Sequence, residues 1–105
     1  MKLVVADHLK TKECLLSCDG AAIRLAVKRG LQADDKVVLS FEGVTDVTSV
    51  FLNTAIGRFY GNYSWDFLKD NLSVENMKPE DMALLKRVVD NAKCFFRKRG
   101  SPFAQ

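Results

Sequence analysis

The chain has 105 residues, of which 48% are hydrophobic and 28% are charged, and its formal net charge is +3. This length and balance predict one globular domain spanning residues 1–105 and exclude a mostly disordered chain. Because much of the positive excess lies near the C-terminus, we expect no broad nucleic-acid-binding surface. Three cysteines, no signal-peptide pattern and no apolar run near the ~20 residues that span a bilayer predict a cytoplasmic protein with reduced thiols.

The N-terminal third of the chain predicts a strand, a loop and a helix. Leu3 to Val5 form a short apolar run typical of an edge strand, which could pair with a second copy of the chain. The polar residues 7–12 predict a loop. Apolar residues at helical spacing over 22–31 predict a helix that Ser17 or Asp19 caps at its N-terminus.

In the central segment, residues 36–60, the spacing of the apolar residues changes in the middle. Residues 37–41 are mostly apolar, which predicts a strand buried on both faces, and the strand and helix before it complete a right-handed βαβ unit. Gly43 ends this apolar run, and a polar turn follows over 45–49. Apolar residues then recur at helical spacing and predict one amphipathic helix over Val50–Tyr60.

The C-terminal third predicts a turn, a strand and a long helix. Residues 65–68 are typical of a short amphipathic turn, and residues 72–77 alternate as in a brief strand. Pro79 is followed by two acidic residues, which is a strong helix start because proline tolerates the first turn and acids favour the helix dipole. Beyond this helix we expect residues 100–105 to form a flexible tail.

The hydroxyl side chains of the polar turn have two interpretations. Ser49 or Thr48 is suited to cap the following helix, which is worth about 1 kcal/mol. Ser49 is also a candidate phosphorylation site, because phosphate adds roughly −1.5 to −2 charges and changes the surface that a partner meets. The two roles are compatible with each other.

Other combinations of reactive side chains fall short of a metal or catalytic site. Cys14, Cys18 and His8 lack a fourth ligand at the spacing of a zinc site, and Cys94 is remote in the sequence. No glycine-rich phosphate-binding loop is present. The carboxylates around the strand ends, which we expect to solvate turns, belong to Asp34, Asp35, Glu42 and Asp46. We therefore expect no enzymatic activity, no metal and no cofactor.

A basic run near the C-terminus is the alternative functional candidate. Its cations, interleaved with phenylalanines, are suited to bind nucleic acid through weak, salt-sensitive contacts. The competing interpretation is a solvated helix end whose positive charge complements the helix dipole. The four cations are Lys93, Arg97, Lys98 and Arg99.

A polar face of the central helix is the main docking candidate. Asn53 and Gly57 lie one turn apart, with Thr54 and Arg58 beside them. This stripe is either solvent surface or a place where a partner's backbone can approach closely. Aromatic side chains nearby would anchor such an interface. The candidate partner-binding residues are Thr45, Asp46, Thr48, Ser49, Asn53 and Gly57.

The central segment V-V-L-S-F-E-G-V-T-D-V-T-S-V-F-L-N-T-A-I-G-R-F-Y resembles the central motif of the STAS-like family, small bacterial proteins related to anti-sigma factor antagonists. The family pattern is a buried strand ending in F-E-G-V, then T-S-x-F-L-N-x-A-I-G. The chain carries it at Phe41 to Val44 and at Thr48, Ser49, Phe51, Leu52, Asn53, Ala55, Ile56 and Gly57. The helix around Asp19-Gly20 and the segment Asn76 to Leu85 are similar to the family layout.

The resemblance implies an α/β fold in which a small mixed sheet has helices packed mainly on one face. In anti-sigma factor antagonists, a D-S-[ST]-G-L-G turn carries the serine that a partner kinase phosphorylates. Ser49 takes the position of that serine, with Thr48 in place of the aspartate and Phe51 in place of the glycine. The resemblance therefore implies a regulatory interaction module whose partner is an ATP-binding, histidine-kinase-like regulator.

Overall fold

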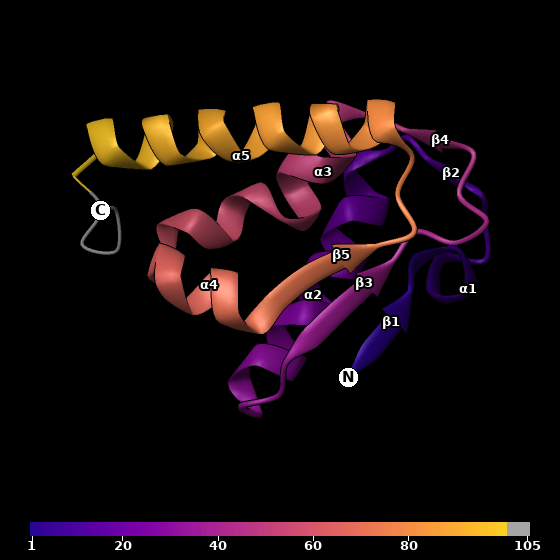
Figure 1. Ribbon diagram of the computed structural model, residues 1–105, viewed down its shortest axis with the longest axis horizontal. Helices are drawn as coiled ribbons and strands as arrows, with labels where there is room; N and C mark the ends of the chain where they lie inside the picture. The colour runs from indigo at the N-terminus through magenta and orange to yellow at the C-terminus, as the bar shows by residue number, and fades with distance from the viewer. Residues whose placement is uncertain (101–105) are drawn as a thin grey trace.

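The computed structural model describes residues 1–100. Helices and short strands are interspersed along this part of the chain, as Figure 1 shows. The elements are β1 (Lys2–Val4), α1 (Val5–Leu9), β2 (Glu13–Cys14), α2 (Ser17–Gln32), β3 (Val37–Ser40), β4 (Asp46–Val47), α3 (Ser49–Ala55), the 3-10 helix η1 (Gly57–Gly61), α4 (Trp65–Asn71), β5 (Leu72–Glu75) and α5 (Pro79–Lys98). Apart from Gly100, the predicted tail lies outside the described residues.

A three-stranded sheet in the order β1-β3-β5 lies in the middle of the fold. Its register aligns Leu3, Leu39 and Val74, and alternation directs these side chains toward the core. Helix α2 lies behind the sheet in Figure 1, and the face toward the viewer has no helix over it. The α/β class and the one-sided packing are therefore as predicted. The expected mixed pairing was wrong, because both strand pairs of this sheet are parallel.

A second, two-stranded sheet pairs β2 with β4, also in parallel. Glu13 is opposite Asp46, and Cys14 is opposite Val47. The polar segment predicted as a simple turn therefore contains a strand. Two residues are too few for a recognisable alternation, so only the partner strand reveals it.

The central helix is shorter than predicted. Helix α3 ends at Ala55, Ile56 has φ −125° and ψ −48°, and the chain continues as η1. Gly57, where the winding tightens, is buried, and a Cβ there would lie 2.7 Å from Asn53 Oδ1. Glycine has a low helix propensity, and 3-10 turns commonly follow an α-helix end.

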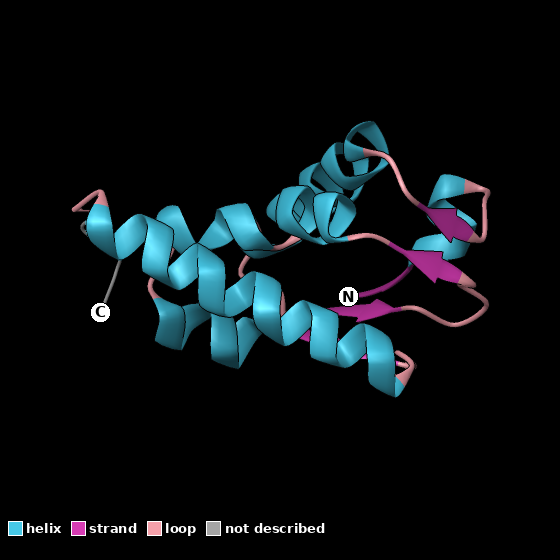
Figure 2. Cartoon of the chain, turned by 90° about the horizontal axis from the view of Figure 1, so that it is seen from above, coloured by secondary structure: helices cyan, strands magenta, loops and turns pink. Residues whose placement is uncertain are grey.

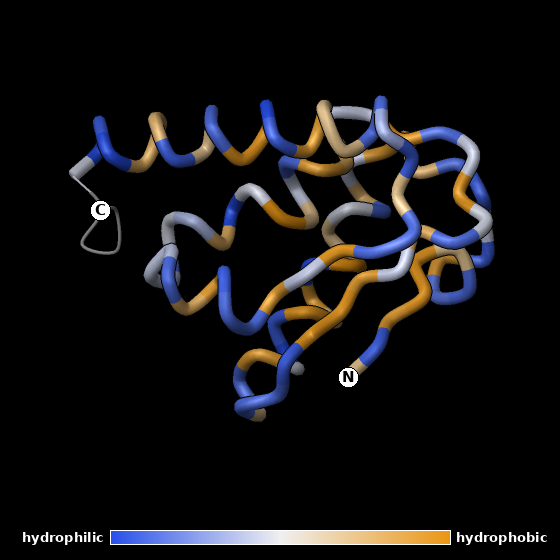
Figure 3. Tube along the Cα trace, in the orientation of Figure 1, coloured by the Kyte–Doolittle hydropathy of each residue, from blue (hydrophilic) through white to orange (hydrophobic). Residues whose placement is uncertain are grey.

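The other helices follow local signals to different degrees. Helix α5 starts at Pro79 as predicted, and its last turn carries Arg97 and Lys98 near the C-terminal end of the dipole. Figure 3 shows hydrophilic and hydrophobic residues alternating along this helix. Helix α1 takes in Val5, the end of the predicted first strand, and the first part of the loop predicted over 7–12. Helix α2 begins at Ser17, with Leu16 as an N-cap that makes no side-chain hydrogen bond, so neither predicted cap acts as one.

The core lies between the sheet and the helices, where α2 and α3 meet closely. Ile23, Phe51 and Leu52 are fully buried. At the crossing, a Cβ on Gly20 would lie 2.7 Å from the Phe51 carbonyl oxygen and 2.9 Å from Thr54 Cβ. A larger residue at position 20 would therefore separate the two helices. Within residues 1–100, no helix combines the length and apolarity needed to cross a bilayer.

Candidate functional site

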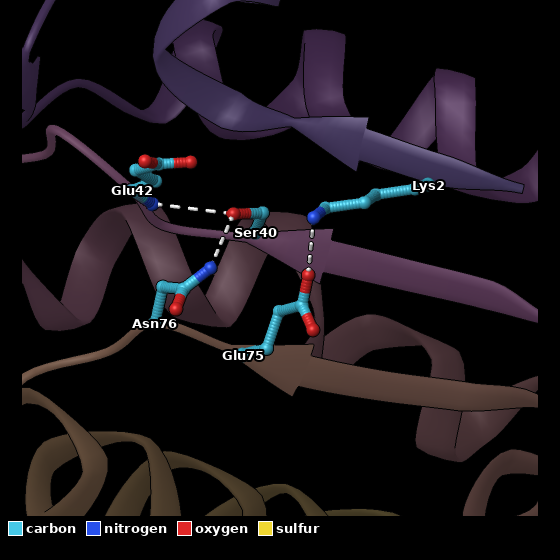
Figure 4. A network of polar contacts seen from close by, with 5 residues as sticks. All are labelled: Lys2, Ser40, Glu42, Glu75 and Asn76. Atoms are coloured by element: carbon cyan, nitrogen blue, oxygen red, sulfur yellow. Dashed lines mark hydrogen bonds and ion pairs between the residues drawn. The ribbon is translucent and has the colours of Figure 1, made fainter.

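A small network of polar contacts fixes the backbone where β3 ends and the candidate turn begins (Figure 4). Ser40 is fully buried, and its Oγ accepts hydrogen bonds from the Glu42 backbone N–H at 3.4 Å and from Asn76 Nδ2 at 3.0 Å. Lys2 Nζ lies 2.8 Å from Glu75 Oε1 on the same face of the sheet. This ion pair raises the pKa of Lys2, first through the hydrogen bond to Glu75. These contacts tie the ends of β3 and β5 together, and they fix the start of the candidate turn.

The turn itself forms hydrogen bonds with Lys12, which precedes β2, and with Lys78, which precedes α5. The Thr45 backbone N–H donates to the Lys12 carbonyl at 2.8 Å, and the Thr45 hydroxyl donates to the same oxygen at 3.2 Å. That hydroxyl also lies 3.1 Å from Asp46 Oδ2. From the other side, Lys78 Nζ donates to the Thr45 carbonyl at 3.0 Å. The turn is therefore held in one position by backbone and side-chain bonds to two other segments of the chain, at Lys12 and at Lys78.

Thr48, not Ser49, caps α3. The Thr48 hydroxyl accepts from the Phe51 N–H at 3.2 Å and donates to the Leu15 carbonyl at 2.9 Å. Ser49 is the first residue of the helix and is exposed, and its side chain makes no hydrogen bond within residues 1–100. The capping role and the candidate modification therefore fall on neighbouring residues.

The predicted docking residues divide into exposed and covered positions. Thr45, Asp46, Ser49 and Asn53 are exposed, and Thr48 is half-buried in its capping role. Gly57 and Thr54, by contrast, are covered. A Cβ at Gly57 would lie 3.4 Å from Val88 of α5, and Thr54 packs against Gly20 of α2. The expected polar stripe is wrong at these two positions, because both helices that flank α3 pack there.

Beside Ser49 lies a groove that the sequence did not indicate. It has a volume of about 780 Å³ and runs between α3 and η1 on one side and α5 on the other, and Arg24 of α2 also lines it. We name it the α3–α5 groove. Figure 2 shows α5 extending along the molecule beside these helices. Its lining residues are Arg24, Ser49, Val50, Asn53, Arg58, Asn62, Val88, Asn91, Ala92, Phe95 and Phe96. No local motif links residues so far apart in the chain.

The basic end of α5 is largely occupied by contacts within the chain. Lys93 Nζ lies 5.2 Å from the centre of the Trp65 ring, and Arg97 lies 5.5 Å from it. Arg99 lies 4.8 Å from the Phe95 ring centre, whereas Lys98 has no such contact among the described residues. Trp65 is itself half-buried and donates its Nε1–H to a backbone carbonyl. Three of the four candidate nucleic-acid-binding cations therefore already face aromatic rings.

The candidate metal and thiol residues are dispersed. Cys14 is fully buried in the core, where burial first and Asp19 second raise the pKa of its thiol to about 11. Cys18 and Cys94 are exposed on different helices. Among residues 1–100, no group of three or more histidine, cysteine or acidic side chains is placed to hold a metal ion.

The fold is an α/β domain in which helices cover one face of a parallel sheet and a hydroxyl-bearing turn heads the central helix. A comparison with protein families matches residues 19–82 to the STAS-like domain of unknown function (DUF4325). This match covers more than half of the chain, and the chain belongs to this family. No curated protein and no solved structure matched the chain.

Proposed function

We propose that this STAS-like domain is a non-enzymatic, regulatory interaction module that docks a partner protein through the turn at 45–49 and helix α3. One observation carries the proposal: Thr48 caps helix α3, whereas Ser49 remains exposed on a firmly anchored segment. Val50, with an exposed fraction of 54%, adds apolar surface beside it. Functional residues commonly lie on loops that a rigid scaffold positions.

The partner in this proposal is an ATP-binding, histidine-kinase-like regulator that also modifies the module. The kinase transfers the γ-phosphoryl group of ATP to Ser49 Oγ, with loss of the hydroxyl proton and release of ADP. The product carries roughly −1.5 to −2 additional charges at the docking surface. Docking then weakens, because the charge must be desolvated or repels acidic groups of the partner.

A comparison of Ser49→Asp with Ser49→Ala tests the proposal. Both purified variants and the wild-type protein are used to capture partners from a lysate of the native host, and the captured kinase-like protein is quantified by mass spectrometry. We expect Ser49→Ala to retain the partner and Ser49→Asp to lose it about tenfold, the effect of roughly 1.4 kcal/mol. Ser73→Asp is the matched control, because Ser73 is exposed on β5, away from the turn.

Equal recovery of the partner by Ser49→Asp and Ser49→Ala would exclude the switch. A wild-type domain that captures no kinase-like protein would exclude this partner. Incubation of the domain with the captured kinase and ATP, followed by mapping of the phosphorylated residue, locates the modification directly. Phosphate found at a residue other than Ser49 would also contradict the proposal.

A further inference from the structure

We propose that the α3–α5 groove binds an acidic segment of the partner protein that inserts an apolar side chain between α3 and α5. This inference rests on the proposed function and specifies the chemistry of the partner.

The groove is electrostatically one-sided. Arg24 and Arg58 line it, and no aspartate or glutamate does. A smaller hollow of about 310 Å³ shares Arg24 and Asn62 with the groove and adds Lys28. Within residues 1–100, none of these three cations has an ion-pair or aromatic partner. Unpaired cations around a hollow favour an anionic occupant.

The amides and the floor of the groove favour a peptide. The side chains of Asn53, Asn62 and Asn91 make no hydrogen bonds within residues 1–100, so they can pair with a peptide backbone or with carboxylates. Val50 and Phe95 are exposed at 54% and 50%, beside the buried lining residues Val88 and Ala92. Phe95 and Phe96 complete the apolar lining; they pack edge to face against each other, and Arg99 lies over the Phe95 ring. A floor of this kind accepts a large apolar side chain.

The position of Ser49 gives this site a link to regulation. Ser49 lines the same groove as Arg24 and Arg58. A phosphate on its Oγ places negative charge where the partner's carboxylates bind, and it competes with them for the arginines. Modification at this position therefore weakens an acidic partner more than a neutral one.

The experiment selects ligands from a display library of random peptides on the wild-type domain. Binders that also bind the Arg24→Glu/Arg58→Glu variant are removed. We expect the remaining peptides to combine aspartate or glutamate with a large apolar residue, and to bind the double variant about tenfold more weakly or worse. The matched control is Lys36→Glu/Lys86→Glu, which changes the net charge equally at exposed positions outside the groove. It should retain binding within about twofold.

A second measurement does not depend on whether the variants fold. In two-dimensional NMR of the wild-type domain, a selected peptide should shift the side-chain amide signals of Asn53, Asn62 and Asn91. A selection that yields no binder, or basic or purely polar peptides, would overturn the inference. Equal loss of binding in the control variant, unmoved asparagine signals, or a single-stranded oligonucleotide that displaces the peptide would also overturn it.

This outcome is separable from that of the proposed function. If the native partner binds with Ser49 dependence but tolerates Arg24→Glu/Arg58→Glu, the inference fails and the proposed function stands. If peptides bind the groove while native capture does not respond to Ser49→Asp, the groove stands and the switch fails.

Discussion

At the head of α3 the polar side chains bond to backbone groups, whereas at the end of α5 the cationic side chains lie over aromatic rings. Thr45 and Thr48 hold the turn to Lys12 and Leu15, and they leave Ser49 exposed. Lys93 and Arg97, by contrast, cover the Trp65 ring. Both segments are polar in sequence, yet the second uses most of its cations in contacts with rings, whereas the first leaves the Ser49 hydroxyl exposed on an anchored backbone. A polar run is therefore a functional candidate only where its contacts leave such a group accessible.

The largest effect on stability is expected from a substitution that separates helices α2 and α3, which pack against each other beneath the turn. We expect Gly20→Val to lower the free energy of unfolding by roughly 3 kcal/mol, because the new side chain overlaps the Phe51 carbonyl and Thr54. Urea denaturation followed by circular dichroism measures the change. Ala22→Val, at an exposed position of the same helix, is the control and should cost less than about 1 kcal/mol. Equal effects of the two substitutions would show that α2 and α3 do not meet at Gly20.

Substitutions at Thr48 and Ser49 test which of the two residues caps α3. Thr48→Ala removes the cap on the Phe51 N–H and the bond to Leu15, so we expect a loss of about 1–2 kcal/mol of stability. Ser49→Ala should change stability by less than about 0.5 kcal/mol. Thr48→Ser keeps both bonds and should recover most of the loss. Chemical denaturation of the three variants decides between this assignment and a cap made by Ser49, which would reverse the order.

The smallest expected effect concerns the basic end of α5. Lys93→Met removes a cation over Trp65 and should destabilise the domain by about 0.5–1 kcal/mol, whereas Lys98→Met should be nearly neutral. Thermal unfolding measures both variants. Retention on a heparin column at low salt then tests the alternative function as a nucleic-acid-associated protein. Strong, salt-sensitive retention of the wild type that falls equally in both variants would favour that alternative over intramolecular contacts.

Some elements could be predicted from residues within them or next to them in the sequence. Pro79 with its acidic neighbours predicted the start of α5, and the apolar run at 37–41 predicted β3. The family resemblance correctly predicted the α/β class. These elements depend on residues close together in the chain, so composition and periodicity describe them well.

The remaining features depend on contacts between distant segments. Strand β4 exists because Asp46 and Val47 pair with β2, and the break after α3 occurs where Gly57 is covered by α5. The α3–α5 groove joins Arg24 to Arg58 and to Asn91, which lie on three different elements. No spacing rule connects such residues, and the polar stripe predicted from helical periodicity therefore included two covered positions, Thr54 and Gly57.

The cap that Thr48 makes has a consequence for the evolution of the surface at position 49. Since Thr48 secures the helix end, position 49 contributes little to the free energy of unfolding, so selection at that position acts on recognition and not on folding. Recognition can then diverge at that one site while the scaffold stays intact, so paralogues could acquire new partners without first acquiring a more stable fold.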